Sequence, residues 1–185
     1  MKLSPKKLAA TLLLCAQALV SHAFEIASDE FTEHTFLNKS HEFQGFGCDG
    51  QNRSPQLSWH NAPKGTQSFA ITVHDPDAPT GSGWWHWLVY NLPATTQTLV
   101  ADAGTESANT NLPKGAVQAK NDYGIHGFGG ACPPKGHGVH HYQITVYAIK
   151  EKQLEIPKDA SAALVGYMLN ANALGKAQIT GLYQR

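Results

Sequence analysis

The chain has 185 residues, of which 42% are hydrophobic and 15% charged, and its 14 basic and 14 acidic residues balance to zero net charge. This length is sufficient for one domain with a sizeable core. Lys and Arg form no run along the sequence, so nucleic-acid binding, which needs clustered basic side chains, is not expected.

The amino end has the pattern of a secretory signal peptide. Lys2, Lys6 and Lys7 precede an apolar stretch over residues 8–20, and Ser21-His22-Ala23 places small residues at the −3 and −1 positions of a cleavage site. A retained anchor is the alternative, but the apolar stretch is shorter than the roughly 20 residues that span a bilayer. We therefore expect cleavage after Ala23, with residues 1–23 as the signal peptide.

The mature chain is expected to be a single domain over residues 24–185, exported to the periplasm or secreted, without a transmembrane anchor. It keeps eleven basic and fourteen acidic residues, a net charge of −3. Lipoprotein processing at Cys15 is disfavoured because bulky leucines precede it. Export favours a disulfide between Cys48 and Cys132, with two buried free thiols as the alternative.

Three stretches have the two-residue periodicity of strands. Residues 68–74 come first, with Phe69, Ile71 and Val73 on one face and polar residues largely on the other. Residues 87–92 and 141–149 follow. The face predicted for the last strand comprises Tyr142, Ile144, Val146 and Ala148.

Near the carboxyl end, residues 159–174 have helical spacing, capped by Asp159 or Ser161 and ended by Gly175. Residues 179–183 resemble a final strand. The predicted fold class is mainly β, an antiparallel sandwich with Greek-key connections and short helices near the C-terminus. The predicted apolar face of the helix comprises Leu164, Tyr167, Met168 and Ala171.

Two rigid loops each deliver a histidine to the start of a strand. The first, DPDAPTGSGWWHW, runs from Asp75 to Trp87, and the second, GGACPPKGHGVHHY, runs from Gly129 to Tyr142. Proline fixes the backbone and glycine lets it turn, so both loops are stiff and compact. Loops of this kind at a sheet end are common binding sites, and we expect the two to meet at one end of the sheet.

These motifs resemble the two signatures of the phosphatidylethanolamine-binding protein family, also called the Raf-kinase-inhibitor-like family. The closest likeness is to its bacterial branch, and it extends from about Phe43 to Tyr183, including N-x-S-P-x-L-x-W at Asn52 to Trp59. One departure is His141, which stands where the family usually has arginine in H-R-Y.

Membership in this family implies a sandwich of a large and a small sheet with a shallow anion-binding cavity at one end. The cavity would accept phosphate or the head group of phosphatidylethanolamine. Motif matching implies one wall formed by Asp75, Asp77, Pro79 and His86, a second formed by Pro133, His140 and Tyr142, and Trp85 as a lining residue.

A carboxylate beside a phosphate site needs a role, because it repels the ligand. We expect Asp75 to orient and charge His86, while His140, Tyr142 and backbone N–H groups contact the anion. Asp77 has the alternative of an Asx turn within its own loop. Trp84 and Trp87 are expected in the core.

Other chemistry is less well supported by the sequence. Asp75, His86 and His140 together have the residue types of a metal site, but their spacing matches no compact zinc signature. Ser82 lies near His86 without a G-x-S-x-G motif, so a phosphoester hydrolase, acid/base or metal-dependent, is a weak alternative.

The sequence thus predicts an exported binding protein for phosphate-bearing small molecules or phospholipid head groups, with no cofactor, no metal and no enzymatic activity. The main alternative is an interaction module that inhibits a kinase or a serine protease through the pocket region.

Overall fold

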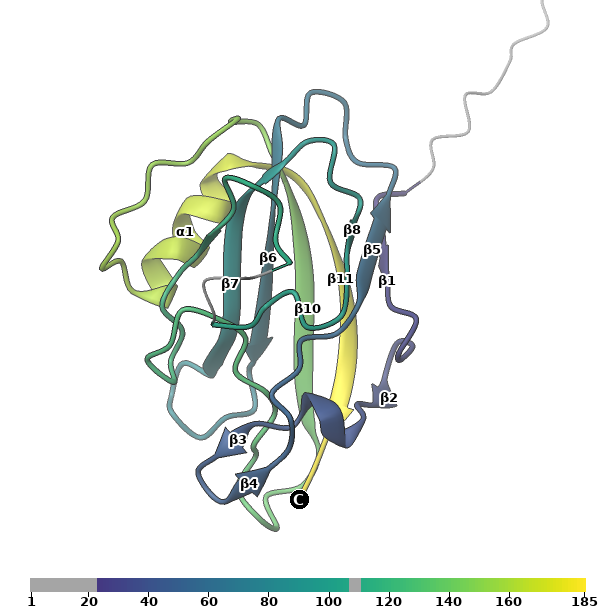
Figure 1. The fold of residues 1–185 in the computed structure, drawn as a ribbon, viewed down its shortest axis with the longest axis vertical. Helices are drawn as coiled ribbons and strands as arrows, with labels where there is room; N and C mark the ends of the chain where they lie inside the picture. Colours follow the sequence, from purple (N-terminus) through teal and green to yellow (C-terminus); the bar gives the residue numbers. More distant parts are fainter. Residues whose placement is uncertain (1–22, 107–110) are drawn as a thin grey trace, which may run out of the picture.

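The computed structural model describes residues 23–106 and 111–185. The predicted signal peptide, including Cys15, therefore lies outside the described residues except for Ala23. The layers of the fold are visible in Figure 1, where the long strands β6, β7, β10 and β11 form the centre, with helix α1 on one side and β1 and β5 on the other. The elements are β1 (Glu25–Ala27), β2 (Thr35–Phe36), the 3-10 helix η1 (Lys39–His41), β3 (Gln44–Gly45), β4 (Cys48–Asp49), β5 (Leu57–His60), β6 (Ser68–Asp75), β7 (Trp84–Pro93), β8 (Thr98–Leu99), β9 (Val117–Gln118), β10 (His140–Ile149), α1 (Ala162–Asn172) and β11 (Ala173–Tyr183).

The strands form a large sheet, a small sheet and a separate hairpin. The large sheet has the order β2-β11-β10-β6-β7-β9, the small sheet β1-β5-β8, and β3 pairs with β4. All pairings are antiparallel except that of β11 with the short β2. The predicted mainly β fold with a large and a small sheet is confirmed, and a single α-helix lies near the C-terminus.

The main core fills the space between the two sheets. Phe69, Ile71 and Val73 of β6 project into it, as their alternation predicts, and meet Leu57 and Trp59 of the small sheet. The predicted face of β10 joins the same cluster. All four of its members are buried: Tyr142, Ile144, Val146 and Ala148.

A second core lies on the opposite face of the large sheet, under α1. Ala70 of β6 and Leu88 of β7 meet Val165 and Leu169 of the helix there. The central strands are therefore covered on both faces, and β6 and β7 are buried along almost their whole length.

The predicted face of α1 is wrong. The helix buries Ala162, Val165, Gly166 and Leu169, whereas Leu164 and Tyr167 are exposed. Both faces of this uncharged helix are apolar, so residue spacing alone does not distinguish them. The buried side is the one with small residues, and Gly166 lets the helix approach the ring of Trp85.

The predicted helix ends were partly correct. The hydroxyl of Ser161 accepts a hydrogen bond from the backbone N–H of Leu164 at 3.2 Å, which caps the first turn. The helix ends at Asn172 rather than at Gly175, because β11 begins at once with Ala173 and pairs with β10 along its whole length.

The two faces of α1 should differ in their effect on stability. We expect Leu169→Ala, at a fully buried position, to lower the free energy of unfolding by about 2–5 kcal/mol. The matched change Leu164→Ala, at an exposed position on the same helix, should cost below about 1 kcal/mol. Urea unfolding followed by circular dichroism measures both, and equal losses would contradict this assignment of the faces.

Candidate ligand-binding pocket

The two rigid loops meet at one end of the large sheet, at the bottom of Figure 1. Strand β6 ends there at Asp75, which pairs with Trp84 at the start of β7. Strand β10 begins there at His140 and runs beside β6. Antiparallel pairing of three neighbouring strands thus places the ends of both motifs side by side.

An irregularity in β7 determines where His86 points. The pairing with β6 shifts by one residue, since Val73 faces Trp87 while His74 faces Trp85, so His86 is the extra residue of a bulge. Trp85 packs on the helix side of the sheet. His86 instead lies on the same side as Trp87, where it contacts the ring of Tyr142 at a centroid distance of 5.0 Å.

The His86 ring is fixed by backbone carbonyls. Its Nδ1 lies 2.8 Å from the carbonyl oxygen of Gly129 and 3.1 Å from that of Gly130. Burial lowers the pKa of His86 to about 4, and the opposing effects of the two carbonyls and of Asp75 are smaller. The imidazole is therefore neutral at physiological pH.

The expectation that Asp75 orients and charges His86 is wrong. The Oδ2 of Asp75 accepts a hydrogen bond from Nδ1 of His140 at 2.6 Å, and both side chains are almost fully buried. The Nε2 of His140 in turn lies 2.8 Å from Nδ1 of His137. Asp75 thus joins the end of β6 to the start of β10, because the sheet register places His140 within its reach.

Asp77 has a similar joining role nearer the surface. Its backbone N–H donates to Oδ1 of Asp75 at 2.9 Å, so the Asx turn exists, but Asp75 supplies the side chain. The Oδ2 of Asp77 accepts from both the backbone N–H and Nδ1 of His141, each at 2.8 Å. Burial raises the pKa of Asp77, but the bonds from His141 outweigh this and lower it. His141 thus engages a carboxylate from the position where the family usually has arginine.

A pocket of about 170 Å³ opens between the two loops. Of the predicted site residues, Pro79, His86, Pro133 and Tyr142 line it. Asp75, Asp77 and His140 do not line it: Asp75 and His140 are bonded to each other, and the carboxylate of Asp77 is bonded to His141. The complete lining is Phe46, Ala78, Pro79, Thr80, Trp84, His86, Tyr123, Cys132, Pro133, Pro134 and Tyr142.

The tryptophans were assigned the wrong way round. Trp84 lines the pocket, whereas Trp85 lies on the opposite face, beside α1 and with its ring 4.3 Å from that of His74. Trp87 belongs to the core, as expected. Alternation counted back from His86 places Trp84 on the same side of the sheet and Trp85 on the other. The bulge at His86 breaks the alternation when it is counted back from the core residue Trp87.

Two further aromatic residues of the pocket, Tyr123 and Phe46, lie outside the two loop motifs. Tyr123 precedes the second loop, and its ring stacks on Phe43 at a centroid distance of 3.9 Å. Phe46 lies in the turn between β3 and β4 and is 72% exposed at the pocket rim. Neither segment has a strand pattern strong enough to place it at the pocket from sequence.

Three side chains that line the pocket have buried polar atoms without a hydrogen-bond partner in the described part of the protein. These atoms are Nε2 of His86, Nε1 of Trp84 and the hydroxyl of Tyr142. Buried polar atoms are almost always paired, since leaving one unpaired costs about 1–3 kcal/mol. Three of these atoms belong to side chains that line this one pocket.

The Tyr142 hydroxyl keeps its proton under all ordinary conditions. Burial raises its pKa strongly, the negative charge of Asp75 adds to this, and the nearby backbone N–H of Cys132 opposes it only weakly. Burial, reinforced by Asp75, also raises the pKa of Tyr123, whose hydroxyl donates to the carbonyl of Gly130. Tyr142 is therefore a neutral donor at the pocket.

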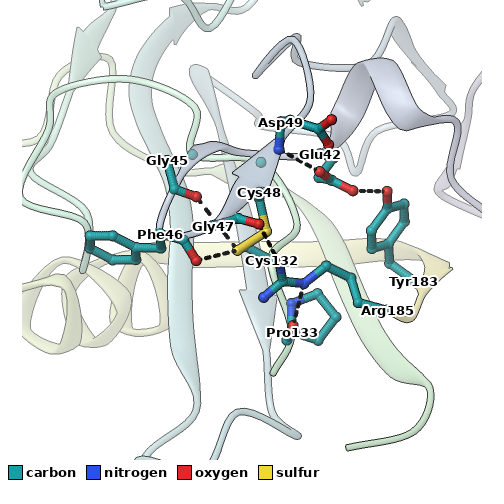
Figure 2. Close-up of a disulfide and its surroundings, with 12 residues drawn as sticks. Glu42, Gly45, Phe46, Gly47, Cys48, Asp49, Cys132, Pro133, Tyr183 and Arg185 are labelled. Atoms are coloured by element: carbon teal, nitrogen blue, oxygen red, sulfur yellow. Dashed lines mark hydrogen bonds between the residues drawn. A yellow bond between two sulfur atoms is a disulfide. The ribbon is translucent and has the colours of Figure 1, made fainter. Parts of the chain in front are cut away.

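The predicted disulfide between Cys48 and Cys132 is present, and Figure 2 shows its surroundings. It ties the β3–β4 hairpin, which carries Phe46, to the second loop. A closed loop of 84 residues corresponds to about 4–5 kcal/mol at most in the chain-entropy view. Arg185 supports the same region through bonds to the carbonyl oxygens of Pro133 and Gly47, both at 2.8 Å.

Within residues 23–106 and 111–185, no group of three or more His, Cys, Asp or Glu side chains is arranged to hold a metal ion. Asp75 and His140, two of the three candidates, are bonded to each other. In the same described ranges, no helix combines the length and apolarity that a membrane crossing requires.

A model of the phosphatidylethanolamine-binding protein family matches residues 27–184. The chain belongs to this family. The resemblance inferred from the two loop motifs is therefore confirmed, and the pocket lies between the loops that carry those motifs.

Two proteins from Escherichia coli are similar to most of the chain. UPF0098 protein YbcL is 56% identical over 162 residues, which cover 88% of this chain and 88% of that protein. UPF0098 protein YbhB is 42% identical over 159 residues, which cover 86% of this chain and 99% of that protein. The crystal structure of YbcL, described as a new member of the mammalian family, matches with a TM-score of 0.85 over 88% of this chain and 98% of its own.

The buried neutral His86 should make stability depend on pH. In the unfolded chain a histidine takes up a proton near pH 6.5, whereas folded His86 does so only near pH 4. Its contribution is complete above pH 6.5 and is lost as the pH falls to 4, an effect of about 3 kcal/mol. Urea unfolding at several pH values should show this decline in the wild type and a flatter one in His86→Gln. His60→Gln, at the exposed end of β5, is the control, and an equal slope in all three proteins would contradict the prediction.

Proposed function

We propose that this protein is a binding protein whose pocket holds a phosphate-bearing small molecule or a phospholipid head group. The observation that carries the proposal is the set of three unpaired buried polar atoms on Trp84, His86 and Tyr142. The indole N–H and the phenol O–H are donors, and phosphate oxygens are strong acceptors.

The size and stiffness of the pocket favour a small ligand. A volume of about 170 Å³ is below the roughly 300 Å³ at which drug-sized sites begin, so a phosphate with a short substituent fits and an acyl chain remains outside. Pro79, Pro133 and Pro134 hold the walls in place, which reduces the entropy lost on binding.

The charge around the pocket favours a ligand with low net charge. No Lys or Arg is among the described lining residues, and the buried carboxylate of Asp75 is already paired with His140. Binding energy then comes from hydrogen bonds in a water-poor site, where each is worth more than in bulk solvent.

We propose a binding role rather than a catalytic one. The hydroxyl of Thr80 is bonded to the carbonyl of Gly83, and His140 is held between Asp75 and His137. These groups are engaged in holding the loops, so they are poorly placed as nucleophile or base.

The second candidate is a protein-interaction module, such as an inhibitor of a kinase or a serine protease. It is favoured by Phe46, a large apolar side chain that is 72% exposed at the pocket rim. If it holds, Phe46→Ser should abolish partner binding and leave binding of small phosphates unchanged.

The two donors should be needed for phosphate binding. We expect Trp84→Phe and Tyr142→Phe each to weaken the binding of phosphoethanolamine about tenfold or more, because each removes one hydrogen bond to a charged group. Tyr167→Phe, on the exposed side of α1, is the matched control and should bind normally. Isothermal titration calorimetry measures the affinities, and unchanged binding in both pocket variants would refute the assignment of the site.

Export is part of the proposal and has its own test. If residues 1–23 are a signal peptide, the protein recovered from the periplasm or the medium should begin at Phe24. Edman sequencing of that fraction measures the start, and recovery of the protein only in the cytoplasm with its amino end intact would contradict export.

A further inference from the structure

We infer that the pocket selects ligands that bring a hydrogen-bond donor of their own, either a phosphate that keeps one P–OH hydrogen or an ammonium group beside the phosphate. The selecting group would be Nε2 of His86, a buried atom without a partner among the described residues, on a ring that lines the pocket. The inference rests on the proposed function and specifies which phosphate compounds qualify.

The contacts of the ring fix the tautomer of His86. Carbonyl oxygens only accept hydrogen bonds, and those of Gly129 and Gly130 both lie within bonding distance of Nδ1. The hydrogen of the neutral ring is therefore on Nδ1, and Nε2 carries a lone pair. This atom is buried and has no partner among the described residues.

Burial is the main reason that His86 is neutral. Of its neighbours on β6, Asp75 raises the pKa of His86 and His74 lowers it. Tyr123 and Tyr142 contact its ring, and both phenols stay protonated because burial raises their pKa values.

On its inner side, His86 shares with His41 a buried cavity of about 10 Å³ that is lined mostly by apolar residues. Desolvation outweighs all the other influences, which gives His86 a pKa of about 4.

The pocket therefore offers two donors and one acceptor. Trp84 Nε1–H and Tyr142 O–H suit two phosphate oxygens. If a third phosphate oxygen that carries no hydrogen faces Nε2 of His86, the lone pairs of the two atoms repel each other. No cation among the described lining residues offsets this repulsion. A protonated oxygen, or an N–H from an ethanolamine arm, turns that repulsion into a hydrogen bond.

The first test compares methyl phosphate with sulfate on the wild-type protein at pH 5 and pH 8. The second pKa of a phosphomonoester is about 6, so its singly protonated form falls from about nine-tenths to about one-hundredth of the total. His86 stays neutral across this range. We expect the affinity for methyl phosphate to fall about a hundredfold, and sulfate, which carries no hydrogen at either pH, to show no measurable binding in calorimetry.

The second test separates free phosphates from lipid head groups. The methyl esters of phosphoethanolamine and of phosphocholine are phosphodiesters without a P–OH or any other O–H, and only the first has N–H hydrogens. Binding of the ethanolamine compound alone at pH 8 would support the donor requirement and identify a head group as the source. Binding of neither diester, with methyl phosphate bound at pH 5, would support it and identify phosphomonoesters.

Two variants locate the effect at His86. His86→Asn can keep an N–H for the carbonyls of Gly129 and Gly130 but removes the Nε2 acceptor, so it should bind sulfate and methyl phosphate alike, with no dependence on pH between 5 and 8. Tyr142→Phe should weaken the binding of methyl phosphate, whereas the preference for methyl phosphate over sulfate and the hundredfold effect of pH should persist. If His86→Asn does not fold, the wild-type comparison is decisive by itself.

The outcomes separate this inference from the proposed function. Equal binding of methyl phosphate at both pH values, sulfate binding of similar strength, or equal binding of the two diesters would overturn the donor requirement and leave the phosphate pocket intact. Failure of all four compounds to bind at either pH would overturn the pocket and this inference together.

Discussion

The bond between the His86 ring and the carbonyls of Gly129 and Gly130 is the contact on which the site depends. It fixes the tautomer of the histidine and joins β7 to the second loop. The two glycines make this approach possible. A Cβ on Gly130 would lie 2.4 Å from the carbonyl oxygen of His41, and one on Gly129 would lie 2.3 Å from the ring of Tyr123. The glycines of the second motif thus have a packing reason, since no larger residue allows the backbone to reach the histidine.

The remaining polar groups of the motifs hold the walls of the pocket from outside. Asp75 joins β6 to β10 through His140, and Asp77 joins the first loop to His141. The disulfide joins the β3–β4 hairpin to Cys132 in the second loop. Each of these contacts is satisfied within the protein, whereas the polar atoms of Trp84, His86 and Tyr142 are not. The division suggests that the aspartates and His140 build the pocket, and that the unpaired groups meet the ligand.

Much of the fold followed from the sequence because strand alternation is a local signal. It placed Phe69, Ile71 and Val73 in the core correctly. Helical spacing failed for α1, because apolar residues surround the helix. Its contacts with the sheet, among them Trp85 against Gly166, decide which side is buried. Strand alternation failed at His86, because a bulge in β7 depends on pairing with β6 and leaves no mark in the order of residues. The partner of Asp75 was missed for the same reason, since the sheet register and not the sequence distance brings His140 to it.

A pocket without a cation selects ligands differently from one built on Lys or Arg. A cationic site attracts any oxyanion through charge and loses affinity as salt screens that attraction. Here the three unpaired groups, on Trp84, His86 and Tyr142, are neutral, so in the proposed site a ligand is distinguished by the match between its donors and acceptors and those of the protein. Hydrogen-bonding sites of this kind reject analogues that leave a buried polar group unpaired. In the proposed selection, the desolvation that lowers the pKa of His86 also keeps its lone pair available. A more exposed histidine would take up a proton near neutral pH and donate a hydrogen bond to any anion.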